Sequence, residues 1–186
     1  MEVVARVSKV WRKRMLMLTL FGLAGGGWFF YDGFVGYPKQ IVRAKEFQQF
    51  ELEGRVAEWP AHAASKGWRT DNPGEPKTAK DLDTQKQCGM LGVLLSLSLA
   101  GYWFWSEQRC IRLDGEVITA PTGTQVQLSE ITEVDRRKWD GKGIAIALYE
   151  RDGERRKLII DDYKYEGAVQ ILEEVERRLG TPGQTA

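Results

Sequence analysis

Histidine and cysteine are scarce in this 186-residue sequence, which contains one histidine and two cysteines. A structural zinc site needs four nitrogen or sulfur ligands, which His62 cannot supply in a chain without a Cys-x-x-Cys pair. Cys88 and Cys110 would lie ~33 Å apart on one continuous helix, too far for a disulfide within the chain. The sequence therefore predicts no metal site, no cofactor and no disulfide framework.

Catalytic constellations are also missing from the sequence. No nucleophile is paired with a base. Asp161 and Asp162 lack further metal ligands at a spacing typical of a metal site. No basic face carries the aromatic residues typical of nucleic-acid binding. We therefore expect neither an enzyme nor a nucleic-acid-binding protein, and no small-molecule substrate is evident.

A long run without charge, residues 88–105, is the feature around which the chain is organised. Its eighteen residues include no acidic or basic side chain. As a helix the run reaches ~27 Å, about the hydrocarbon thickness of a bilayer. It ends in four consecutive aromatic residues, typical of a membrane interface. We expect a transmembrane helix over residues 88–106.

A second apolar segment, residues 15–35, is uncharged as far as residue 31 and ends in an aromatic band. Residues 1–14 carry five basic side chains, and basic residues before a span hold that end in the cytoplasm. We therefore expect a basic cytoplasmic N-terminus and a first transmembrane helix. The alternative is a cleaved signal peptide, although no clear A-x-A site ends the run.

Small residues recur every four positions in both apolar segments. Gly22 and Gly26 lie in the first, and Gly92, Ser96 and Ala100 in the second. Small residues on one face let two membrane helices approach closely, so this spacing predicts a packed hairpin. The alternative is that glycine is simply frequent in membrane helices.

The polar segment between the two spans, residues 36–87, is expected to form a mostly helical extracytoplasmic loop. Pro38 and Pro60 suit first helical turns, whereas Pro73, Gly74 and Pro76 favour an irregular connection. The aromatic residues of this loop either lie on the membrane surface or cover the partner helix, or they form a small core of the loop itself, and the sequence does not separate these two interpretations. They are Phe47, Phe50, Trp59 and Trp68.

After the second span the pattern changes to short alternating strands, in residues 107–180, followed by a tail at residues 181–186. Asp-Gly pairs at residues 114–115 and 152–153 are typical of tight turns between antiparallel strands. In the strand that begins at residue 144 we expect Ile144, Ile146 and Leu148 to face the core. An apolar stripe then predicts a helix that ends at Gly180 and comprises Ala168, Ile171, Leu172, Val175 and Leu179.

This order, an antiparallel meander closed by one amphipathic helix, resembles that of bacterial pleckstrin-homology-like domains attached to membrane spans. The resemblance covers about 70 residues and includes QLSEITEVDRRKW and KGIAIAL, although the strands recognised in the sequence are fewer than the family's seven. It implies a binding or assembly module, in some cases for lipid headgroups.

Two basic clusters in this region are candidates for contact with anionic lipid headgroups. From residue 107 onward, however, the chain holds 13 basic and 16 acidic residues, so a solvated strand face is the alternative. The clusters are Arg136, Arg137 and Lys138, and Arg155, Arg156 and Lys157.

The sequence thus predicts an α+β membrane protein with a two-helix transmembrane hairpin and a pleckstrin-homology-like domain. We expect a multi-pass protein of the bacterial inner membrane, with both termini cytoplasmic. Its partners would be the lipid bilayer and either another protein or further copies of itself, as a homo-oligomer.

Overall fold

The computed structural model describes residues 2–180, which form two compact units. One unit is residues 18–98, and the other combines residues 2–17 with residues 99–180. The architecture is α+β with antiparallel sheets, as predicted.

Helices build the unit of residues 18–98. Helix α1 (Lys9–Tyr31) continues through a π-helical turn, η1 (Asp32–Gly36), into α2 (Tyr37–Leu52). The short helices η2 (Val56–Glu58) and α3 (Trp59–Ser65) follow, and an irregular segment leads to α4 (Ala79–Glu107). Thr78 caps α4: its hydroxyl accepts from the Asp81 amide at 3.3 Å, while the Asp81 carboxylate accepts from the Thr78 amide at 2.7 Å.

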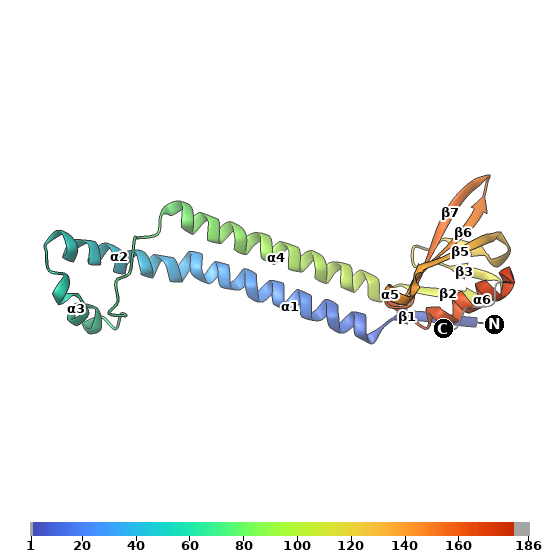
Figure 1. The fold of residues 1–186 in the computed structure, drawn as a ribbon, viewed down its shortest axis with the longest axis horizontal. Coiled ribbons are helices and arrows are strands. Elements are labelled where there is room, and N and C mark those ends of the chain that lie inside the picture. Colours follow the sequence, from blue (N-terminus) through green and yellow to red (C-terminus); the bar gives the residue numbers. More distant parts are fainter. Residues whose placement is uncertain (1, 181–186) are drawn as a thin grey trace. The chain divides into compact units, whose positions relative to one another are not determined.

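Helices α1 and α4 run side by side in this unit (Figure 1). A Cβ placed on Gly26 would lie 2.9 Å from Val93 Cγ2 and 3.1 Å from the Gly89 carbonyl oxygen. Both distances are shorter than ordinary van der Waals contacts, so this approach requires glycine.

The loop aromatics form a small core of their own. Phe47, Trp59 and Ala63 are buried, with Phe50 and Trp68 packed against them. The rings of Phe47 and Trp59 meet edge to face, with centroids 5.1 Å apart. The sequence leaves two interpretations of these aromatic residues open, and the structure shows that they form a small core of the loop itself.

Two antiparallel sheets build the other unit. The larger has strand order β4-β3-β2-β1-β8 and comprises β1 (Glu2–Val7), β2 (Cys110–Asp114), β3 (Val117–Thr119), β4 (Gln125–Gln127) and β8 (Tyr165–Glu166). After η3 (Leu128–Glu130), the smaller sheet has the order β5-β6-β7. Its elements are β5 (Ile131–Lys138), the short helix α5 (Trp139–Lys142), β6 (Ile144–Arg151) and β7 (Glu154–Asp161).

The sequence predicts that residues 1–14 form a basic segment separate from the domain, but residues 2–7 form strand β1 of its larger sheet. Five residues of β1 pair with β2, from Glu2 with Asp114 to Arg6 with Cys110, and Val7 pairs with Tyr165 of β8. Val3, Ala5 and Val7 are buried in the main core. The domain expected at residues 107–180 therefore also includes residues 2–7, and everything from α1 to α4 is an insertion between two paired strands.

Helix α6 (Ala168–Leu179) covers the core with the predicted stripe, because Ala168, Ile171, Leu172 and Val175 are buried there. The Val169 amide donates to the Asp162 carboxylate at 2.9 Å, which satisfies one free amide of the first turn. Gly180, with φ 70°, ends the helix in the left-handed conformation.

The ends of α1 and α4 are joined to this unit by charged and aromatic contacts. The Arg12 guanidinium donates to both carboxylate oxygens of Glu107, at 2.8 and 2.7 Å. The Lys164 ammonium donates to the Tyr102 hydroxyl at 2.9 Å and lies 4.9 Å from the Trp11 ring centroid. Residues 9–15 and 99–107 therefore belong to the domain as well as to the helices.

Candidate functional site

The outer face of the β5-β6-β7 sheet is the candidate site. Its central strand presents Ile144, Ile146 and Leu148 outward, while Ala145, Ala147 and Tyr149 of the same strand are buried. The prediction that Ile144, Ile146 and Leu148 face the core is therefore wrong. Every residue from 144 to 149 is apolar or aromatic, so a period of two does not say which set turns inward.

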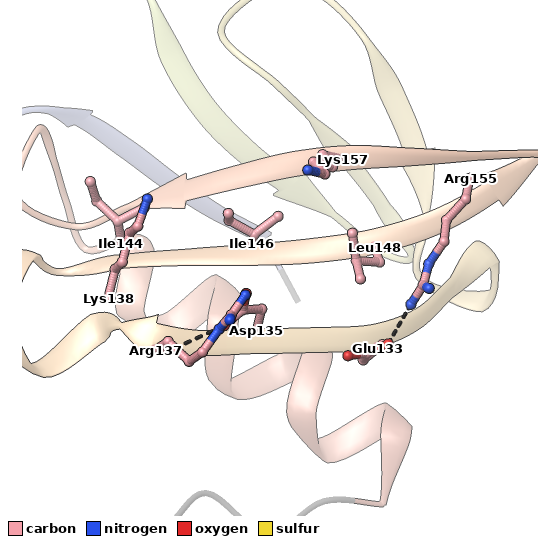
Figure 2. Close-up of a pocket in the computed structure, with 9 residues that line it drawn as sticks. All are labelled: Glu133, Asp135, Arg137, Lys138, Ile144, Ile146, Leu148, Arg155 and Lys157. Carbon is pink, nitrogen blue, oxygen red and sulfur yellow. Dashed lines mark hydrogen bonds and ion pairs between the residues drawn. The ribbon is translucent and has the colours of Figure 1, made fainter.

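Charged side chains border this apolar strip on both neighbouring strands. Glu133, Asp135, Arg137 and Lys138 stand on β5, and Arg155 and Lys157 on β7, around a cavity of about 630 Å³ (Figure 2). Cross-strand pairing sets Leu148 between Glu133 and Lys157, and Ile146 between Asp135 and Ile159. Ile159, 57% exposed, widens the apolar area.

The two carboxylates on this face are paired. Arg155 bridges to Glu133, and Arg137 donates to Asp135 with a shortest distance of 2.6 Å (Figure 2). The Arg137 guanidinium lowers the pKa of Asp135 to about 2. Among residues 2–180, no carboxylate lies within 4.0 Å of the ammonium groups of Lys138 or Lys157. The face therefore carries two uncompensated positive charges beside aliphatic side chains that are half-buried on β6 and exposed at Ile159.

The six basic residues suggested by the sequence do not gather in one place. Arg136 turns to the opposite side, where it pairs with Glu176 of α6 at 3.1 Å, and Arg156 pairs with Glu154 at 3.0 Å. An irregularity in the pairing of β5 between Asp135 and Lys138 lets the consecutive residues Arg137 and Lys138 both line the outer face. Four of the six basic residues thus border the strip.

The small residues suggested for helix packing lie in the two long helices. A Cβ on Gly22 would collide with the Ser96 hydroxyl, and one on Gly92 would lie 3.2 Å from Gly26 Cα. Ala100 is partly buried near the end of α4. Gly89, which the four-residue spacing does not include, also lies at this contact, because a Cβ there would meet the Phe30 ring at 3.0 Å.

Comparison with known proteins finds no matching family, no similar curated protein and no similar solved structure. The function therefore rests on the geometry of this chain. Within residues 2–180, no group of three or more His, Cys, Asp or Glu residues is placed to hold a metal ion. What the candidate site offers is an apolar strip with excess positive charge, which suits binding.

Proposed function

We propose that this protein crosses a membrane twice and presents a domain that binds a protein partner on the outer face of its β5-β6-β7 sheet. Helix α4 supports the first part, because within residues 2–180 it is the one helix long and apolar enough to cross a membrane. Only 11% of its apolar stretch is buried, unlike the core helix of a soluble protein. Exposed aliphatic side chains such as Leu91 and Leu95 would be covered by lipid.

The pairing of β1 with β2 carries the argument for a second crossing. These strands lie in one sheet, yet one precedes α1 and the other follows α4. If α4 were the only crossing, β1 and β2 would lie on opposite sides of the membrane and could not pair. The proposal therefore includes a second crossing and assigns it to α1, which does not meet the apolar criterion that α4 meets but exposes Phe21 (81%) and Trp28 (66%).

Basic residues favour the cytoplasm for the sheet domain. The consecutive cluster of Arg12, Lys13 and Arg14 directly precedes the apolar part of α1 and decides the orientation, because the other basic residues near the span ends are nearly balanced. Arg109 and Arg112 follow α4, and on the other side stand Lys39, Arg43, Lys45, Lys77, Lys80 and Lys86. Positive charge close to a span resists translocation. The loop of residues 36–87 then lies on the opposite side.

The proposal also includes the resemblance of the domain to pleckstrin-homology-like domains. Its two antiparallel sheets and its closing helix support this resemblance.

The partner is a protein segment with apolar and acidic side chains. Ile146, Leu148 and Ile159 would bury its apolar side chains, while Lys138 and Lys157 would meet its carboxylates. Strand β7 has no second partner strand in residues 2–180, so its free backbone groups can pair with an extended segment. A lipid surface fits this face less well, because Glu133 and Asp135 stand among the basic residues and Arg136 and Arg156 point elsewhere.

Site-specific photocrosslinking from position 159 in intact membranes tests this proposal. We expect an adduct with a second protein, formed through an acidic and apolar segment. Lys157→Glu reverses a charge on the face and should abolish the adduct. Arg156→Glu makes the same change on the same strand but away from the face, so it should leave the adduct intact.

A compensating charge reversal in the partner gives the positive control. Replacing one acidic residue of the crosslinked segment with lysine should recover the adduct with Lys157→Glu. Equal adducts from the Lys157→Glu and Arg156→Glu proteins would refute the assigned face. Adducts confined to lipid would indicate a headgroup sensor, and adducts between two copies of this chain would indicate self-association.

A further inference from the structure

A second cavity lies in the helical loop, between α2 and the segment that follows α3. It measures about 560 Å³, within the range of small-molecule sites. Val42 and Trp68 supply its apolar surface, and three basic side chains, Lys39, Arg43 and Arg69, stand around it. All of these residues lie within the unit of residues 18–98, so the cavity does not depend on the sheet domain.

Arg43 is held in place by Asp71. Its Nη2 donates to the Asp71 backbone oxygen at 2.6 Å and also bonds the Asp71 carboxylate. The Trp59 indole donates to the same backbone oxygen at 3.2 Å, which ties the segment to the loop core. Both bonds from Arg43 use Nη2, so Nη1 of the guanidinium is not engaged by Asp71.

Charge around this cavity is unbalanced. Asp71 also pairs with Arg69 at 3.1 Å, so one carboxylate serves two guanidinium groups. Within residues 2–180, no carboxylate lies within 4.0 Å of the Lys39 ammonium. Three cations beside one anion leave an excess of two positive charges. This excess matches in magnitude the negative charge of a phosphate monoester at neutral pH.

We propose that this cavity binds a phosphate monoester carried on an apolar body. Lys39, Arg43 and Arg69 hold the phosphate, and Val42 with the Trp68 ring covers the apolar part. The ligand is either a lipid of the adjacent leaflet or a small soluble molecule, since both present the same chemistry. The lipid source rests on the proposed crossing by α1, from which a short continuous helical path through η1 leads to Lys39, close to the level of the lipid headgroups.

Two measurements on the full chain test the site and distinguish these sources. Calorimetric titration with hexyl phosphate, in an uncharged detergent, measures binding of a soluble ligand. Native mass spectrometry after release from nanodiscs of phosphatidylcholine with phosphatidic acid measures retention of the lipid. We expect saturable binding in at least one measurement, weakened about tenfold by Arg69→Ala or Lys39→Ala because each removes a charge-assisted contact.

Lys45→Ala is the matched control, because Lys45 is exposed on α2 and does not line the cavity. It should leave binding unchanged. Arg69 is 83% exposed, so its substitution should not unfold the loop, whereas Arg43→Ala would also release Asp71. Binding lost with Arg69→Ala and kept with Lys45→Ala supports the site. No saturable binding in either measurement, or equal losses with Lys45→Ala and Arg69→Ala, would overturn it.

Discussion

Ala5→Asp should destabilise the sheet domain severely. Ala5 is completely buried in β1, which lies between β2 and β8. A carboxylate there would have apolar neighbours in the main core, and a buried charge without a partner costs about 3–5 kcal/mol. A domain of this size is stable by only about 5–15 kcal/mol. The melting temperature of the domain should therefore fall by about 15–30 °C.

Hydrogen exchange of the purified full chain in detergent measures this effect locally. Peptides that cover β2 should lose protection with Ala5→Asp, because β2 pairs with β1 along its whole length. Arg6→Asp is the control on the same strand, since Arg6 is exposed and lies opposite Glu166. Its like-charge contact should cost less than about 1 kcal/mol. Unchanged protection of β2 with Ala5→Asp would show that residues 2–7 are not part of the sheet.

Two further predictions concern the helix pair and the sheet face. Gly26→Leu should weaken the contact of α1 with α4 by about 1–2 kcal/mol, whereas Gly27→Leu, which meets nothing within 4 Å, should have little effect. Equal losses of hairpin stability in a detergent unfolding assay would contradict this contact. The pair of Arg137 with Asp135 should stabilise the domain fully above pH 4, and this contribution should disappear as the pH falls through the lowered pKa of about 2. Asp135→Asn should remove that part of an acid-unfolding profile, and an unchanged profile would contradict the assignment.

Local signals in the sequence predict much of the fold. Asp152 and Gly153 both have positive φ, 57° and 76°, as the tight turn between β6 and β7 requires. The stripe of α6 and its end at Gly180 follow from helical periodicity and a glycine stop. These features depend on neighbours within a few residues, which is why the sequence alone indicates them.

Strand β1 could not be recognised in this way. Its pairing partner, β2, begins more than a hundred residues later, and no local pattern records that contact. The apolar residues of β1 also directly precede a basic segment that reads as a membrane-flanking tail. The prediction of which face of β6 is buried is wrong for a related reason. Both faces of this strand are apolar, so only its packing against the rest of the domain decides which one is buried.

The most direct test of the account is the side of the membrane reached by three single cysteines, in a chain from which Cys88 and Cys110 have been removed. Glu2→Cys lies on β1, Thr122→Cys in the turn after β3, and Leu52→Cys on the loop, where Leu52 is 88% exposed. In sealed right-side-out vesicles, an impermeant maleimide should label only Leu52→Cys, and permeabilisation should expose the other two. Opposite labelling of Glu2→Cys and Thr122→Cys, or identical labelling of all three, would contradict a domain built from both ends of an inserted membrane hairpin.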